Sequence, residues 1–243
     1  MRLGHRSRWT FNLYPDAGEG GGCFLPTLRA QPEPGGTPDT ERSQQEAGRR
    51  ARGKLRRYCA ANRLNRFVTL TYGGGGCFDP QQLRLDVAEF FRGLRRELDG
   101  KPLPYAWASE WHPGGHGLHV HFAVGRYVRQ RLIRDVWGRG IVHIKLIGDL
   151  PVGSGALEEA RRAASYLAKY VSKNIADERV PNLDRYEVAQ GFQPLKVPLA
   201  AESDQAVIEQ ASQRMGGPPA RVWRSSEQEG WRAPPAYWCA WAG

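Results

Sequence analysis

The 243-residue sequence has few cysteines and no long apolar run. Its four cysteines form no CxxC pair, so their spacing favours neither a zinc ribbon nor a thioredoxin-like redox site. Nowhere do roughly 18 apolar residues follow one another, and the basic N-terminus lacks the apolar core of an export signal. These absences predict a cytoplasmic protein with reduced thiols and no membrane partner.

The sequence also lacks a nucleotide-binding loop and an excess of acidic residues. The glycines at 73–76 are not followed by Gly-Lys-Ser/Thr, so they do not form a P-loop. Lysine and arginine number 35 against 25 aspartates and glutamates, which gives a net charge of +10. A positive field of this size attracts polyanions and holds them through phosphate contacts, although arginine-rich compositions also accompany GC-rich genomes. Nucleic acid is therefore the leading candidate partner.

Glycine, proline and small polar residues crowd positions 15–43, and this composition cannot bury enough apolar surface to offset chain entropy. We expect a flexible leader over 1–43, a principal domain over 44–180, and a C-terminal extension over 181–243 that packs on that domain. The stretch 44–63 predicts an arginine-rich helix. Its charges form either a solvated face or a contact with DNA backbone. The second interpretation makes candidates of Arg56, Arg57 and Arg63.

The periodicity of the apolar residues predicts a mixed fold. We expect strands over 66–72, 104–111, 118–125 and 140–147. We expect helices from Asp79-Pro80 to Asp99-Gly100 and near 128–137, 155–175 and 202–214. This order predicts the α+β class, with a central antiparallel sheet and helices packed on one face. The tryptophans between Trp223 and Trp241 are expected to cover a core edge rather than to stack on bases.

Two histidines, His119 and His121, lie two residues apart in a predicted strand. The period of two points both imidazoles from one face of the sheet, while Leu118, Val120 and Phe122 pack on the other. Such a pair suits the capture of a divalent cation. A structural pair of histidines at a sheet edge is the alternative.

A hairpin is expected just before these histidines. Gly114 and Gly115 in the sequence HPGGHG supply the positive φ values of a tight turn, while His112 and His116 are expected at the surface. A turn centred there places Glu110 opposite His119 on the same face.

The same register sets Ala108 opposite His121, with Trp111 opposite Leu118 on the reverse face. Two imidazoles and a carboxylate leave coordination positions open, as a catalytic site requires, and we expect Mg²⁺ or Mn²⁺ there. On the strand 140–147, His143 and Lys145 either line a DNA-binding surface or face solvent.

Tyrosines and lysines share one side of the predicted helix 155–175. An apolar stripe at three-and-four spacing marks the opposite, core-facing side: Leu157, Ala160, Ala164, Leu167, Val171 and Ile175. Tyr166 and Tyr170 lie off the stripe, one turn apart, beside Lys169 and Lys173. They form either ordinary amphipathic surface or a pair of nucleophiles in a field that favours phosphate.

Three segments together resemble the motifs of the HUH endonuclease superfamily, specifically its rolling-circle replication initiators (Rep proteins) of plasmids and phages. They are RFVTLTY (66–72), LHVHF (118–122) and YLAKYVSKN (166–174), and the last is similar to the paired-tyrosine form. The resemblance covers residues 66–175. Conjugative relaxases usually place the tyrosine before the histidines, so the order in this chain favours replication.

The resemblance implies a five-stranded antiparallel sheet related to RNA-recognition folds, with the metal on central strands and the tyrosine on a facing helix. By motif position, His119 and His121 are metal ligands, Glu110 fits the acidic ligand, and Tyr166 or Tyr170 is the nucleophile. Lys169 would steady the phosphate charge. The remaining DNA contacts are expected at Arg56, Arg57, Arg63, Lys173, His143 and Lys145.

The implied activity is metal-dependent nicking and joining of single-stranded or origin-hairpin DNA through a 5′-phosphotyrosine intermediate. Because helicase motifs are absent from the sequence, a helicase and a DNA polymerase of the bacterial host cell are the expected partners. Two alternatives stay open. One is a transposase or mobilisation nickase with the same active site, and the other is a non-catalytic module that stacks bases on an RNA-recognition-like sheet.

Overall fold

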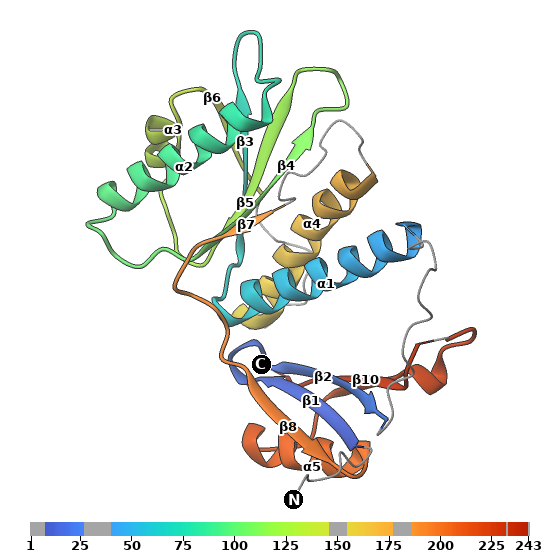
Figure 1. Cartoon of the computed structure of the whole chain (residues 1–243). Coiled ribbons are helices and arrows are strands. Elements are labelled where there is room, and N and C mark those ends of the chain that lie inside the picture. The colour runs from blue at the N-terminus through green and yellow to red at the C-terminus, as the bar shows by residue number, and fades with distance from the viewer. Residues whose placement is uncertain (1–7, 27–39, 146–154, 177–185, 232, 243) are drawn as a thin grey trace, which may run out of the picture. The chain divides into compact units, whose positions relative to one another are not determined.

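The computed structural model describes residues 8–26, 40–145, 155–176, 186–231 and 233–242, with side chains described in these ranges except over 40–45 and 171–176 (Figure 1). The chain divides into two compact units, Thr40–Gln193 and a second unit made of Met1–Asp39 with Pro194–Gly243. In the described residues each unit contains a five-stranded sheet. The α+β class is confirmed, with two sheets where one was expected. Of the described helices, none combines the length and apolar character needed to cross a membrane.

In the unit Thr40–Gln193 the strands follow the order β6-β3-β5-β4-β7, and the paired strands are antiparallel. Its elements in chain order are α1 (Thr40–Ala61), β3 (Arg66–Tyr72), α2 (Pro80–Glu97), β4 (Tyr105–Trp111), β5 (Leu118–Val124), α3 (Gln130–Trp137), β6 (Gly140–Lys145), α4 (Ala156–Ala176) and β7 (Glu187–Val188). Every helix and strand predicted between residues 66 and 175 is present. The last two residues of the predicted strand 140–147 lie outside the described residues.

The ends of α2 show why these predictions hold. The Asp79 carboxylate accepts a hydrogen bond of 2.8 Å from the Gln81 N–H, and Pro80 occupies the first turn, where no N–H is needed. The helix ends where Asp99 and Gly100 adopt left-handed φ angles of 57° and 67°. Local side-chain chemistry therefore fixes both boundaries.

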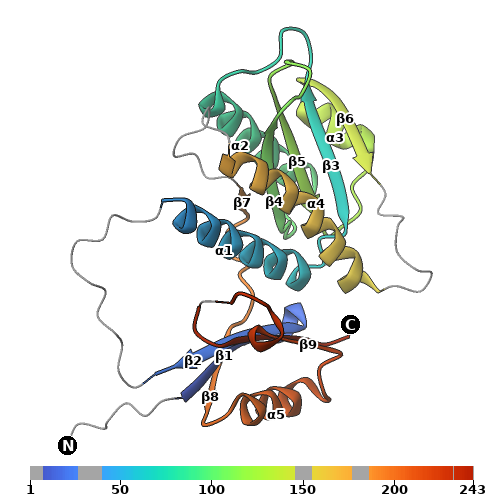
Figure 2. The same cartoon turned by 90° about the vertical axis from the view of Figure 1, so that its right-hand side faces the viewer.

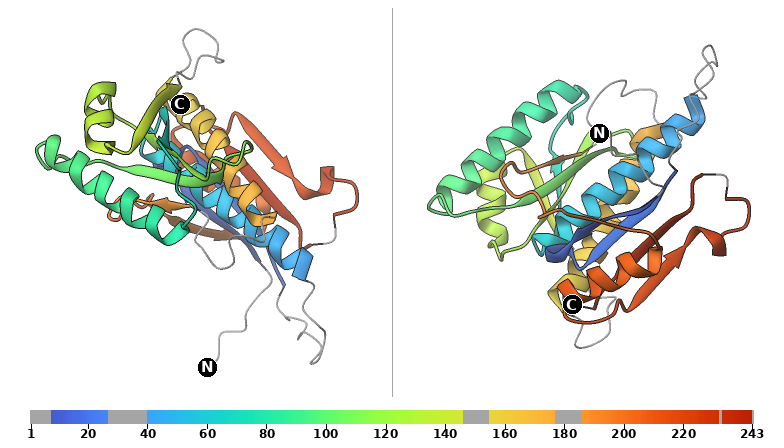
Figure 3. Two further views of the ribbon diagram at one scale, coloured as in Figure 1. Left: turned by 90° about the horizontal axis from the view of Figure 1, so that it is seen from above. Right: turned by 60° about the horizontal axis from the view of Figure 1, so that its bottom comes forward.

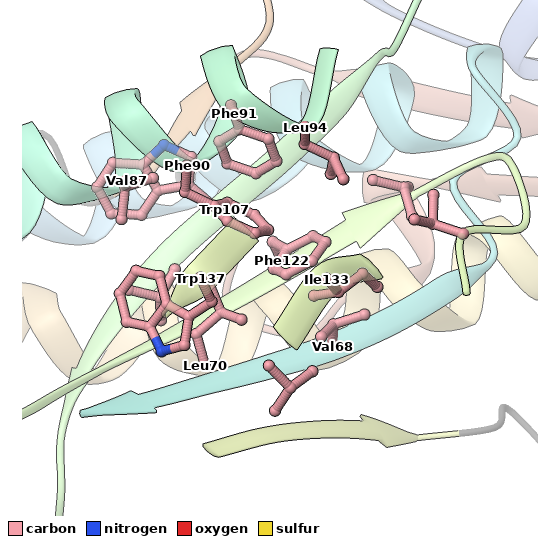
Figure 4. Close-up of a cluster of buried hydrophobic side chains, with 14 of the residues drawn as sticks. Val68, Leu70, Val87, Phe90, Phe91, Leu94, Trp107, Phe122, Ile133 and Trp137 are labelled. Atoms are coloured by element: carbon pink, nitrogen blue, oxygen red, sulfur yellow. The ribbon is translucent and has the colours of Figure 1, made fainter. Parts of the chain in front are cut away.

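Helices cover both faces of this sheet, and the prediction of a single covered face is wrong (Figures 1 and 3). On one face, the rings of Phe90, Phe91, Trp107 and Phe122 pack with other apolar residues of α2, α3 and the strands (Figure 4). On the other face α1 and α4 pack against residues that include Ala106, Ala108 and Ala123. Alanines leave room for helices to approach closely, and a strand pattern of large and small apolar residues is buried on both sides.

The second unit joins the two ends of the chain in one sheet of order β8-β1-β2-β10-β9. Its strands are β1 (Arg8–Tyr14), β2 (Glu19–Leu25), β8 (Val197–Ala201), β9 (Arg221–Arg224) and β10 (Ala236–Ala240), its helix is α5 (Asp204–Met215), and two 3-10 turns are η1 (Pro15–Ala17) and η2 (Ser225–Glu227). Phe11, Val207 and Trp241 belong to its buried core. The segment expected as a C-terminal extension thus supplies half of a separate sheet from Pro194 onward.

Residues 8–25 form paired strands, where a flexible leader was expected from the sequence. The reason lies in the glycines of β2. A Cβ atom on Gly20 would lie 2.3 Å from the Phe11 ring, and one on Gly22 would lie 1.8 Å from the carbonyl oxygen of Thr10. Glycine is required here because β1 approaches so closely, and composition alone does not distinguish this from a linker.

Candidate active site

Polar side chains from neighbouring strands meet on the sheet face that α4 packs against. His119 and His121 of β5 pair with Thr71 and Thr69 of β3, and Thr69 also pairs with His143 of β6. Figure 2 shows α4 running across this sheet. The alternation of the strands therefore gathers hydroxyl, imidazole and carboxylate groups beneath the helix that carries the two tyrosines.

The predicted register of the hairpin is confirmed. Glu110 of β4 lies opposite His119, Ala108 opposite His121, and Trp111 opposite Leu118.

The turn itself differs in its torsion angles from the prediction. The His112 N–H donates to the Gly117 carbonyl at 2.8 Å, and the positive φ angles belong to Gly115 and Gly117, at 79° and 81°. Gly117 is needed because a Cβ there would lie 2.3 Å from the backbone oxygen of Cys77. The loop after β3 thus packs against the hairpin.

Both ring nitrogens of His121 have polar neighbours. Nε2 lies 3.1 Å from Oε2 of Glu110, and Nδ1 lies 3.0 Å from the hydroxyl oxygen of Thr69. The two side chains of the His121–Glu110 pair are only 7% and 14% exposed. Such contacts on both nitrogens fix the orientation of the imidazole before any ligand binds.

His119 is held at one nitrogen and open at the other. Its Nδ1 lies 3.3 Å from the hydroxyl oxygen of Thr71, while Nε2 is buried and has no hydrogen-bond partner among the described residues. Burial, followed by the neighbouring His112 and His121, lowers the pKa of His119 to about 4, although Glu110 opposes this shift. The imidazole is therefore neutral at pH 7, with a buried nitrogen that lacks a partner.

His112 contacts the site, although it was expected at the surface. Its ring stacks on that of His119 with centroids 4.5 Å apart, and it is half-buried. His116, the other histidine of the turn, is exposed as expected.

The donor set fits a divalent cation in its chemistry. Glu110, His119 and His121 supply one carboxylate and two imidazoles, and the unpartnered Nε2 of His119 is the type of atom that a metal satisfies. Within the described ranges, no three His, Cys, Asp or Glu side chains already surround a common point. The contact between Glu110 and His121 engages two of the three donors with each other.

The core-facing stripe of α4 is confirmed as far as its side chains are described. Leu157, Ala160, Ala164 and Leu167 are buried, while the side chains of Val171 and Ile175 lie outside the described residues. Tyr166 and Tyr170 lie off the stripe and are half-buried.

Both tyrosines lie at the polar cluster. The ring of Tyr170 stacks on that of His121, with centroids 3.7 Å apart and planes inclined by 9°. The ring of Tyr166 lies 5.8 Å from that of Phe67, with the ammonium groups of Lys145 and Lys169 at 4.1 and 5.0 Å from its centroid. One tyrosine thus touches a candidate ligand, and the other lies between two cations.

The candidate DNA contacts separate into different places. Arg56 lines a cavity of about 360 Å³ between α1 and α4, together with Arg52 and Lys169. Arg57 lies close to Gly53 of its own helix, and the guanidinium of Arg63 donates to the carbonyl of Ala60 at the end of α1. His143 and Lys145 are exposed on β6. The side chain of Lys173 lies outside the described residues.

Thr69, Thr71 and Phe67 contribute to the site, although no role was assigned to them from the sequence. All three belong to the segment RFVTLTY, in which every second residue points to the face of the two histidines. The signal was present in this alternation. It was missed because threonine is common in strands for its branched Cβ alone.

Comparison with known families places this cluster in context. Residues 65–175 match the family model of the replication-associated protein ORF2. No curated protein and no solved structure gave a match. The matched segment begins just before β3 and ends within α4, so it contains the histidines, Glu110, the threonines and both tyrosines. This similarity supports a role in the initiation of replication.

Proposed function

We propose that the unit Thr40–Gln193 is a metal-dependent DNA nickase that initiates rolling-circle replication. The observation that carries the proposal is the stacking of Tyr170 on His121, 3.7 Å apart, inside a segment similar to replication-associated proteins. A phenol, two imidazoles and a carboxylate in one cluster match the needs of a nucleophilic attack on phosphorus.

Glu110, His119 and His121 would hold the cation, for which Mg²⁺ or Mn²⁺ is the expected ion. When bound, the cation polarises a phosphoryl oxygen of the scissile phosphate. The neutral state of His119 keeps its buried Nε2 available as a donor, and Glu110 would exchange its hydrogen bond with His121 for the cation. Thr69 and Thr71 hold the imidazoles from the Nδ1 side throughout.

In the proposed reaction, the phenolic oxygen of Tyr166 or Tyr170 attacks the phosphorus in line with the leaving 3′ oxygen. The oxygen–phosphorus bond to tyrosine forms while the bond from phosphorus to O3′ breaks. The phenol loses its proton to solvent, and the departing O3′ takes up a proton. The products are a 5′-phosphotyrosine linkage and a free 3′ hydroxyl, which a host polymerase extends.

The chain supplies positive charge where the phenolate and phosphate carry negative charge. Lys145 and Lys169 lie 4.1 and 5.0 Å from the ring centroid of Tyr166. Fixed cations of this kind stabilise the charge that develops in the transition state. Arg52 and Arg56 extend the basic surface from Lys169 onto α1, where the DNA backbone would bind.

The second tyrosine would serve strand joining. After one round of replication, a second phenol takes over the new strand end while the first linkage is resolved by the 3′ hydroxyl. Tyr166 and Tyr170 lie one helical turn apart, and both pack beside Phe67, at 5.8 and 6.2 Å. A host helicase would separate the strands.

The test is the formation of a covalent protein–DNA band on a denaturing gel with labelled single-stranded DNA. The band is expected with Mn²⁺, to disappear with EDTA, and to be lost in Tyr166→Phe combined with Tyr170→Phe. Phenylalanine retains the ring stacking and removes only the hydroxyl, so the double variant is expected to fold. An adduct formed by the double variant, or DNA binding in EDTA without any adduct in Mn²⁺, would overturn the proposal.

A further inference from the structure

A second basic pocket lies in the unit Thr40–Gln193, away from the histidines. It has a volume of about 550 Å³ and is bounded by the end of α2, the loop into β4, and the residues that follow β7. This volume falls in the range of roughly 300 to 1,000 Å³ that is usual for small-molecule sites. The pocket is large enough for a nucleotide.

Three cations line this pocket. Arg92 and Lys101 are exposed at its margin, and Arg95 is half-buried in its wall. None of the described residues that line it carries a carboxylate. Asp99 lies outside the lining, and its oxygen is 3.8 Å from the Lys101 ammonium in an exposed pair, which stabilises little. The pocket therefore favours an anion.

The wall that carries Arg95 is held in place by aromatic packing. The rings of Tyr105 and Phe91 stack with centroids 3.5 Å apart and planes inclined by 3°. The Arg95 guanidinium lies 5.5 Å from the Tyr105 ring centroid and donates a hydrogen bond of 3.4 Å to its hydroxyl. A cation with a fixed orientation loses less conformational entropy on binding phosphate than a free surface arginine does.

The remaining lining suits a nucleobase. Leu103 and Phe192 supply apolar surface, and the amide of Gln190 is both a donor and an acceptor for a base edge. Gly100 adopts a φ of 67°, and no atom lies within 4 Å of the position that a Cβ would take, so the mouth is open there. Cations at the margin and an apolar interior correspond to the two halves of a nucleotide.

We propose that this pocket binds a nucleotide unit through its phosphate and base, as a second contact for the DNA that the nickase cuts. The inference rests on the proposed function. Tyr105 and Glu110 are five residues apart on β4, which corresponds to roughly 17 Å of strand. A strand that reaches both places spans about five stacked nucleotides at roughly 3.4 Å each. A free nucleotide would use the same chemistry.

The test measures binding of fluorescent DNA by anisotropy in EDTA, where no nicking occurs. The variant is Arg92→Glu with Lys101→Glu, and the control is Arg96→Glu, an exposed arginine of the same helix that does not line the pocket. We expect the double variant to weaken binding of a long oligonucleotide at least about tenfold, which corresponds to about 1.4 kcal/mol. The slope of log affinity against log salt should fall by about 0.7 for each lost phosphate contact.

Two further arms identify the source of the ligand. An oligonucleotide that covers only the histidine site should bind both forms equally. A deoxynucleoside monophosphate that binds the wild-type chain and not the double variant would assign the pocket to free nucleotides, and binding of DNA alone would assign it to the strand.

Equal weakening by Arg96→Glu, or unchanged binding of every ligand in the double variant, would overturn the inference. At saturating DNA the pocket variant should still form the covalent adduct. Failure of the pocket is therefore distinguishable from failure of the nickase proposal.

Discussion

The hydroxyl oxygen of Thr69 lies 3.0 Å from Nδ1 of His121, on the side of the ring opposite Glu110. When the ring proton stands on Nδ1 and is donated to Thr69, Nε2 is left as an acceptor for a cation. Thr71 has the same relationship to His119 at 3.3 Å. Adjacent strands thus supply the imidazoles and the groups that orient them.

Replacing Thr69 with valine removes this contact and preserves the shape of the side chain. Loss of such a supporting hydrogen bond usually lowers metal affinity about 10- to 100-fold, and we expect a loss of this size for Mn²⁺ measured by calorimetry. Thr69→Ser keeps the hydroxyl and should stay near wild-type affinity. If valine and serine variants bind Mn²⁺ as tightly as wild type, Thr69 does not position His121.

The metal-free protein should show an acid-sensitive contribution from His119. Its pKa falls from the usual 6.5 to about 4 on folding, so the unfolded chain takes up the proton first. Stability is therefore expected to decrease as the pH falls from about 6.5 to about 4, with no further contribution from this group above that window. NMR titration of the imidazole should give a midpoint well below that of exposed His116. A midpoint near 6.5 would contradict the burial of the ring.

The cation above Tyr166 should act on the rate of attack more than on DNA affinity. Lys145→Met keeps an unbranched apolar chain and removes the ammonium that lies 4.1 Å from the Tyr166 ring centroid. We expect adduct formation at saturating DNA to slow about tenfold, or about 1.4 kcal/mol in activation free energy. Arg131→Gln, at a side chain that is 90% exposed on α3, is the matched loss of charge and should leave the rate unchanged. Equal rates for Lys145→Met and wild type would remove Lys145 from the mechanism.

The glycines of β2 should differ sharply in their tolerance of alanine. Gly22→Ala places a Cβ 1.8 Å from the Thr10 carbonyl oxygen and is expected to destabilise the second sheet by about 1 to 3 kcal/mol, as overpacking does. Gly21→Ala meets its nearest neighbour at 3.5 Å, an ordinary contact, and should be neutral. Denaturant unfolding followed by tryptophan fluorescence measures both. Equal stability of the two variants would show that β1 and β2 are not paired as described.

Sequence patterns predicted the unit Thr40–Gln193 well because its signals are local. Asp79 and Pro80 begin a helix by capping, and alternation along residues 118–124 separates the imidazoles from the core. The opposition of Glu110 and His119 followed from the turn, since hairpin register depends on loop length. The stacking of Tyr170 on His121 joins residues far apart in sequence, and only the resemblance to a known superfamily anticipated it.

The second sheet was not predictable by the same reasoning. Its strands come from both ends of the chain, so β1 and β8 pair across most of the sequence. β2 contains three consecutive glycines, which reduce any strand signal to that of a linker. Coverage of the sheet by α1 and α4 was also missed, because alanines at 106, 108 and 123 mark a helix-packing face only when the neighbouring strands are known.

The most direct test is to identify the amino acid that becomes joined to DNA. Trypsin separates the two tyrosines, since cleavage after Arg162, Lys169 and Lys173 yields Ala163–Lys169 with Tyr166 and Tyr170–Lys173 with Tyr170. After reaction with single-stranded DNA and Mn²⁺ and digestion of the DNA, mass spectrometry should find a nucleotide on one of these peptides. A nucleotide attached to any other peptide, or to none, would contradict a tyrosine nickase on α4.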